Sequence, residues 1–171
     1  MNFYSQLEKI AKIQPERNAI FWEGGNLNYL DFCHMANSIG SALSKKFNLK
    51  KGDNVALVME NGYLFLPILF GIWKAGLTAV PINCKLHKKE LDWIFENSDT
   101  KLIFCSTEKI SDIHSNVPVI VNYSKEFIQI SKFEHLSNLK TEVTDPAWIF
   151  YTSGTTGKPK GAVLTHRNLL S

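Results

Sequence analysis

Apolar residues recur at helical spacing in three segments of the chain, which predicts three amphipathic helices. Their apolar faces are Phe3, Leu7 and Ile10; Phe32, Ala36, Ile39 and Leu43; and Leu91, Ile94 and Phe95. Pro15 should end the first helix, because proline cannot continue the hydrogen-bond ladder. A fourth helix is predicted within residues 62–76, which are apolar on nearly all sides and finish at Gly76, a residue suited to a left-handed C-cap.

Short apolar runs bounded by turn residues predict strands between these helices. They are a hairpin around Gly24 and Gly25, single strands within residues 55–59, 78–82, 101–105 and 117–122, and the pair Ala147–Tyr151 and Ala162–Thr165. Residues 106–144 otherwise give a weak signal, and a last helix begins at His166. Strands that alternate with helices predict an α/β fold: a mainly parallel sheet with flanking helices, an opening hairpin, and a strand–loop–strand hairpin near the C-terminus.

Composition narrows the class of ligand. The 171 residues are 44% hydrophobic, which is enough to form the core of one domain. The net charge of +3 is too small for binding nucleic acid through its phosphates, so a small anionic ligand fits better. Short lysine runs are interpreted as solvated helix faces.

Cysteine and histidine give no evidence for a metal site. Cys33, Cys84 and Cys105 have no paired spacing, and the five histidines are scattered singly. We therefore expect no metal ligand among them and a reducing compartment. The N-terminus lacks the pattern of a secretory signal, and no apolar run is long enough to span a bilayer, so we expect a soluble cytoplasmic protein.

The segment "YTSGTTGKPKG", residues 151–161, combines glycines, hydroxyl residues and lysines after an apolar strand. Glycines let backbone amides approach a ligand closely, hydroxyls donate hydrogen bonds, and lysines supply positive charge, so this composition predicts polyphosphate binding. The P-loop pattern of NTPases is absent, and Pro159 disfavours a helix at this point. A turn-rich surface hairpin would explain the glycines and Pro159, but not the hydroxyls and lysines together. We expect Thr152–Gly161 to be an exposed, mobile loop without nucleotide.

The longer stretch "YTSGTTGKPKGAVLTH" resembles the phosphate-loop signature of the adenylate-forming superfamily, which includes acyl-CoA synthetases, peptide-synthetase adenylation domains and luciferases. "LNYLDF" and "WKAGLTAVPIN" resemble two earlier parts of the same domain. The resemblance covers nearly all of residues 1–171, as the N-terminal portion of an AMP-binding domain, truncated after the phosphate loop. Asn83 stands where peptide-synthetase domains usually carry aspartate, which favours a fatty-acid-type acid–CoA ligase.

This resemblance implies that a carboxylic acid attacks ATP to form acyl-adenylate and pyrophosphate, and that coenzyme A then accepts the acyl group. It implies hydroxyl contacts to phosphate from Thr152, Ser153, Thr155 and Thr156, close backbone approach at Gly154 and Gly157, and a pyrophosphate contact from Lys160. Lys158 lies where the family varies. One of the threonines would also touch the Mg²⁺ that accompanies ATP.

The resemblance places no catalytic residue inside these 171 residues. The family's magnesium-binding acidic residue, ribose aspartate, hinge and adenylation lysine would all follow later in a longer chain. The alternatives are a non-catalytic nucleotide-binding module, a truncated remnant, and an adenylation domain of another carboxylate-activating branch. We also expect the unfinished sheet to expose apolar surface and to favour self-association.

Overall fold

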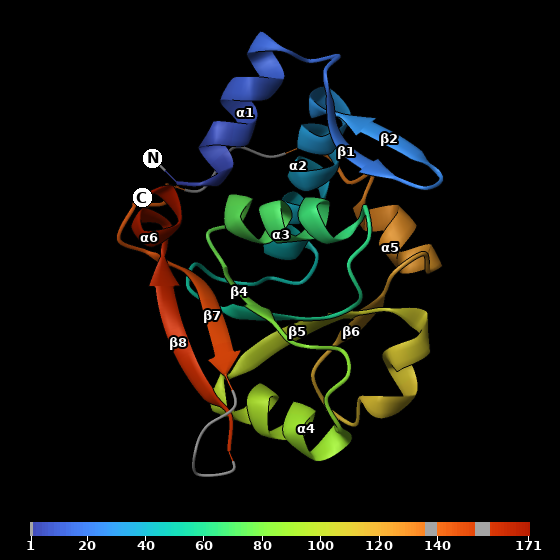
Figure 1. The fold of residues 1–171 in the computed structure, drawn as a ribbon, viewed down its shortest axis with the longest axis vertical. Helices are drawn as coiled ribbons and strands as arrows, with labels where there is room; N and C mark the ends of the chain where they lie inside the picture. The colour runs from blue at the N-terminus through green and yellow to red at the C-terminus, as the bar shows by residue number, and fades with distance from the viewer. Residues whose placement is uncertain (1, 136–139, 153–157) are drawn as a thin grey trace.

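The structure is a computed structural model that describes residues 2–135, 140–152 and 158–171. In these ranges six strands form one sheet in the order β6-β5-β3-β4-β7-β8 (Figure 1). Its strands are β3 (Asn54–Val58), β4 (Thr78–Pro81), β5 (Thr100–Cys105), β6 (Val119–Val121), β7 (Pro146–Thr152) and β8 (Lys160–Thr165). All neighbours pair in parallel except β7 and β8, which are antiparallel. The predicted α/β class with a mainly parallel sheet is confirmed.

Helices cover both faces of this sheet. On one face lie α1 (Tyr4–Ile13), α2 (Tyr29–Lys45) and α3 (Phe65–Lys74), and on the other lies α4 (Lys88–Asn97) (Figure 1). Along β3, Val55 and Leu57 pack with the first group, whereas Ala56 and Val58 pack with α4. Burial on both faces explains why the strand reads as a continuous apolar run.

The remaining elements lie around the sheet. They are the hairpin of β1 (Asn18–Trp22) and β2 (Gly25–Asn28), the 3₁₀ helix η1 (Thr107–Asp112), α5 (Lys125–Ile130) and α6 (His166–Leu170). The opening hairpin and the last helix are as predicted. Within the described ranges, no helix has the length and apolarity needed to cross a bilayer.

The first helix buries a face that only partly matches the one predicted. Tyr4, Leu7 and Ala11 are its buried residues, while Ile10 is 37% exposed and Phe3 only half-buried. The prediction of Ile10 as a core residue is wrong, because α1 packs against α2 through its tyrosine rather than through a purely aliphatic stripe. The phenol oxygen of Tyr4 lies 3.7 Å from the Cys33 sulfur of α2.

Helix α3 ends as predicted, and it begins later than the apolar run suggests. Residues 62–64 form a turn and the helix starts at Phe65. At its end Gly76 has φ +69°, and its N–H donates to the carbonyl of Trp73 at 3.1 Å. A left-handed residue here releases the chain into β4 without a Cβ penalty.

Helices α2 and α3 cross with their backbones unusually close. A Cβ atom on Gly40 would lie 2.6 Å from the carbonyl oxygen of Gly71, and one on Gly71 would lie 2.8 Å from Cγ2 of Ile39. Neither position has room for a side chain. The two glycines therefore set the distance between the helices that cover the sheet.

His166 joins the end of the hairpin to the N-terminal segment. Its ring is fully buried against Trp73, and its Nδ1 accepts a hydrogen bond from the Phe3 N–H at 3.3 Å. Among the described residues its Nε2 has no hydrogen-bond partner. Burial lowers the pKa of His166, and the nearby Asp145 carboxylate opposes that effect.

Stability should consequently fall in mild acid. The unfolded chain takes up a proton at His166 near pH 6.5, whereas the folded chain resists protonation until lower pH, since Nδ1 is already an acceptor. We expect the free energy of unfolding to decrease as pH falls from about 7.5 to about 5.5. Urea unfolding of His166→Gln should show a smaller slope against pH.

The matched control is His135→Gln. The pKa of His135 is also lowered, chiefly by partial desolvation, but this residue lies at the surface rather than in the core, so His135→Gln should change the slope less than His166→Gln does. A slope that His135→Gln reduces as much as His166→Gln does would contradict the role given to His166.

Candidate functional site

The predicted strand–loop–strand hairpin is present, with a shorter loop than the sequence indicated. Pairing of β7 with β8 continues to Thr152 opposite Lys160. Thr152, Lys160 and Gly161 are therefore strand residues, and the prediction that they belong to the loop is wrong. Cross-strand hydrogen bonding extends the ladder past the apolar residues on which the strand boundaries were predicted.

Two of the predicted phosphate-binding residues lie within the described ranges. Thr152 ends β7, Lys160 begins β8, and both side chains are exposed at the loop end of the hairpin. Ser153, Gly154, Thr155, Thr156 and Gly157 lie outside the described residues.

Gly161 serves packing within the hairpin. It pairs with Tyr151, and a Cβ atom on it would lie 3.0 Å from Cζ of that ring and 2.9 Å from Cγ2 of Ile149. A side chain at this position would collide with both. Here the glycine makes room for β7, which differs from the sequence interpretation that glycines in the segment admit a ligand.

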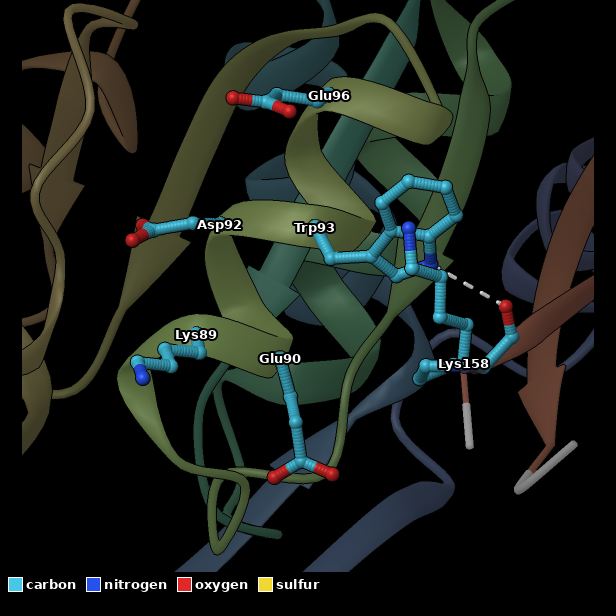
Figure 2. Close-up of a pocket in the computed structure, with 7 residues that line it drawn as sticks. Lys89, Glu90, Asp92, Trp93, Glu96 and Lys158 are labelled. Atoms are coloured by element: carbon cyan, nitrogen blue, oxygen red, sulfur yellow. Dashed lines mark hydrogen bonds between the residues drawn. The ribbon is translucent and has the colours of Figure 1, made fainter. Parts of the chain in front are cut away.

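Helix α4 holds the hairpin on its other side. The Tyr151 hydroxyl donates to Oδ1 of Asn97 at 2.6 Å, and burial raises the pKa of this phenol, which keeps its proton at neutral pH. Near the loop, the Trp93 indole N–H donates to the carbonyl oxygen of Pro159 at 3.3 Å. The Lys158 ammonium lies over the Trp93 ring, 4.2 Å from its centroid (Figure 2).

These α4 contacts were not predicted from the sequence. Apolar spacing correctly identified Leu91, Ile94 and Phe95 as the buried face. Trp93 falls outside that stripe, and spacing alone carries no information about a partner 65 residues away (158 minus 93). An aromatic residue off the apolar face of a helix was the only available signal.

Hollows border the hairpin at the carboxyl ends of the parallel strands. One of about 260 Å³ lies between Asn83 after β4, Glu90 and Ile94 of α4, and Thr152. A larger one of about 730 Å³ is bounded by residues that follow β3 and β4 and by Phe150 and Tyr151. In open α/β sheets, ligands bind outside the carboxyl ends of the strands. The hairpin thus stands at the edge where a ligand would be expected.

A third hollow of about 430 Å³ lies between α4 and Lys158 and Pro159, which form the second arm of the hairpin and lead into β8 (Figure 2). Lys158 and Pro159 line it on the loop side, and Lys89, Glu90 and Trp93 on the helix side. Within the described ranges, no group of three or more histidine, cysteine or acidic residues could hold a metal ion. The described end of the hairpin, Thr152, Lys158 and Lys160, offers hydroxyl and ammonium donors, a set suited to anionic oxygen, while the carboxylates of Glu90, Asp92 and Glu96 line the hollow on the α4 side.

A mainly parallel α/β sheet that ends in a glycine-, hydroxyl- and lysine-rich hairpin defines the N-terminal part of an adenylate-forming enzyme. The chain belongs to the AMP-binding enzyme family, whose sequence model matches residues 7–171.

Relatives come from several branches of this family. Tyrocidine synthase 1 of Brevibacillus parabrevis is 29% identical over 98% of the chain. The fatty acid–[acyl-carrier-protein] ligase ScoC of Streptomyces coeruleorubidus is 33% identical over 94% of it. Among solved structures, a fatty acyl CoA synthetase of Mycobacterium tuberculosis superposes with a TM-score of 0.88 at 25% identity, over 99% of this chain.

Each of these relatives is much longer than the present chain. The chain spans 15% of tyrocidine synthase 1, 32% of ScoC and 36% of the M. tuberculosis synthetase. The shared family is shown over residues 7–171, which correspond to only part of each of these relatives.

Proposed function

We propose that residues 1–171 form the N-terminal portion of the AMP-binding domain of an ATP-dependent acid–thiol ligase. The carboxylate of an organic acid attacks the α-phosphorus of ATP, the bond to the β,γ-phosphates breaks, and acyl-adenylate and pyrophosphate form. The thiol of coenzyme A then displaces AMP and yields acyl-CoA. The single observation that carries this proposal is the β7–β8 hairpin, in which Thr152 and Pro159, within the segment that resembles the family's phosphate loop, line a hollow at the carboxyl edge of the sheet.

The hairpin's role in this reaction is to hold the phosphates. We assign the hydroxyls of Thr152, Ser153, Thr155 and Thr156 to phosphate oxygens, one of them also to the Mg²⁺ that ATP carries. Gly154 and Gly157 allow close backbone approach, and Lys160 faces the leaving pyrophosphate. Fixed donors of this kind stabilise the charge that develops in the transition state, so the hairpin contributes positioning and electrostatics rather than a catalytic proton transfer.

A fatty acid is the proposed substrate class. Asn83, which lines the hollow beside Thr152, departs from the aspartate of peptide-synthetase domains, and two of the relatives are named for fatty acids. The name of ScoC supports a second candidate acceptor, an acyl carrier protein in place of coenzyme A. Thioester products formed with each acceptor, separated by mass, distinguish the two.

The proposed compartment is the cytoplasm. Cys33, Cys84 and Cys105 are free thiols, of which Cys33 and Cys105 are buried. Free thiols are the usual state in a reducing compartment, which supports this assignment.

The two lysines of the hairpin differ in their surroundings, and the proposal predicts that they differ in function. Both lysines are exposed, but Lys158 lies over the Trp93 ring, whereas Lys160 is paired opposite Thr152. In a longer, active chain that carries these residues, Lys160→Ala should lower ATP-dependent pyrophosphate release by about tenfold, the loss of one charge-assisted hydrogen bond. Lys158→Ala should have a smaller effect.

Lys160→Arg serves as the control that retains charge, and it should keep more activity than Lys160→Ala. Steady-state rates at varied ATP concentration measure all three variants. Equal losses in the Lys158 and Lys160 alanine variants would contradict the assignment of Lys160 to pyrophosphate.

A further inference from the structure

Trp93 makes two different contacts with the second arm of the hairpin. Its indole N–H reaches the carbonyl oxygen of Pro159, and the face of its ring lies under the Lys158 ammonium (Figure 2). Both contacts come from one side chain on α4, which is separated from the hairpin in sequence by β5, β6 and α5. They meet the chain where strand pairing has just ended, because the last paired residues are Thr152 and Lys160.

Lys158 and Pro159 make these contacts immediately before β8 begins. Pro159 has no N–H, so its carbonyl is the backbone group that remains for hydrogen bonding, and Trp93 satisfies it. A residue that precedes proline is biased toward extended backbone, which directs Lys158 away from a helical turn. The proline ring restricts φ, and the indole hydrogen bond fixes the carbonyl, so the two together define the direction in which the arm enters β8.

Helix α4 is a firm support for this contact. Leu91 and Ile94, on either side of Trp93 in sequence, are fully buried against the sheet. The Tyr151–Asn97 hydrogen bond ties the last turn of the helix to β7, and Glu90 accepts from the His87 N–H at 3.0 Å to close its first turn. Because both ends of α4 are held in place, Trp93 in its middle can set the position of Lys158 and Pro159, which it contacts.

The ring, rather than an acidic side chain, is the described contact of the Lys158 charge. Glu90, Asp92 and Glu96 line the same hollow, and Figure 2 shows Asp92 and Glu96 directed away from Lys158. A tryptophan face attracts an ammonium through its quadrupole without neutralising it. The Lys158 charge thus stays on the α4 side of the hairpin, away from the strand ends where Lys160 and Thr152 are paired.

From this arrangement we propose that Trp93 is a positioning residue for the phosphate-binding hairpin. It anchors Lys158 and Pro159 to α4, and thereby leaves Lys160 as the lysine presented to the phosphates. The inference rests on the proposed function, because it names a residue that acts on the same site.

The anchor is tested first in the 171-residue chain without nucleotide. Incorporation of 5-fluorotryptophan gives one ¹⁹F resonance for each of the four tryptophans, and Trp93→Phe identifies that of Trp93. Lys158→Met, which keeps length and removes charge, should shift the Trp93 resonance, while the matched variant Lys160→Met should leave it in place. A Trp93 resonance that ignores Lys158→Met, or responds equally to both variants, overturns the proposal.

The second test uses pyrophosphate exchange in a longer, active chain that carries the same residues. Trp93→Leu should raise the KM for ATP about fivefold to tenfold with a smaller loss of kcat, because a displaced hairpin weakens phosphate contacts that are already made in bound ATP. Trp93→Phe, which restores the ring alone, should recover part of the change. In the Trp93→Leu background, Lys158→Met should add little further, since the ring that held the charge is gone.

The outcomes separate the anchor from the ligase reaction. A KM for ATP that is unchanged in Trp93→Leu overturns the positioning role even if the ¹⁹F result is as expected. If the 171-residue chain shows the ¹⁹F response but the longer chain, without substitutions, catalyses no ATP-dependent exchange, the proposed function is removed and, with it, the role of Trp93 toward phosphate.

Discussion

No pyrophosphate release above background is expected from a polypeptide of residues 1–171 supplied with ATP, Mg²⁺, coenzyme A and acids from acetate to palmitate. The chain contributes the hairpin, but it spans only 36% of the M. tuberculosis synthetase and 32% of ScoC. One positioned contact supplies a few kcal/mol, whereas enzymes typically lower barriers by about 8 to 23 kcal/mol. The hairpin alone falls far short of that total, and hydroxamate trapping of acyl-adenylate should also be negative.

The control for this experiment is a complete relative assayed beside the short polypeptide with the same acids. Turnover by the short polypeptide comparable to that of the relative would contradict the prediction and show that 171 residues contain a whole active site.

The same preparation should self-associate in analytical ultracentrifugation, because Phe150 and Val163 on the β7–β8 pair are 50% and 57% exposed at one edge of the sheet.

Gly40→Val should lower the free energy of unfolding by about 3 kcal/mol, through overpacking between helices α2 and α3. The first added atom would lie 2.6 Å from the Gly71 carbonyl oxygen and 2.7 Å from Cδ of Lys74. The lysine side chain can shift, but the backbone carbonyl cannot move unless the whole helix moves. Urea unfolding followed by far-ultraviolet circular dichroism measures the change.

Gly62→Ala is the matched control for Gly40→Val. A Cβ atom on Gly62 would meet no atom within 4 Å, so its free energy of unfolding should stay within about 0.5 kcal/mol of the unsubstituted chain. If Gly40→Val were as stable as Gly62→Ala, the close crossing of the two helices would not exist in solution.

Local pattern was sufficient for most elements of this fold. Helical spacing located α2 and α4 with their buried residues, and Gly76 marked the end of α3 because glycine adopts a positive φ without the steric cost that a Cβ atom brings. It failed at α1, where Ile10 has the right spacing and the wrong neighbours. Spacing says that a face exists, while the packing partner decides which face is buried.

For the hairpin, too, the sequence predicted some features and not others. Its two strands, their connection, and the hydroxyl, glycine and lysine content that predicts phosphate binding could be seen in the sequence. The sequence could not show that pairing continues to Thr152 and Lys160, because hydrogen bonds between strands do not depend on side-chain polarity.

By itself, then, the sequence determined the α/β class, the family resemblance and the segment that carries the candidate chemistry, since each is encoded in residues adjacent in the chain or repeated at a fixed period. Only the tertiary structure decided which lysine faces α4, that a side chain at Gly161 would press on Ile149 and Tyr151, and that Trp93 contacts Lys158 and Pro159. The physical reason is that each of these depends on contacts made across the fold. Van der Waals contacts, cation–π attraction and hydrogen bonds act over a few ångströms in space, and sequence separation places no limit on them.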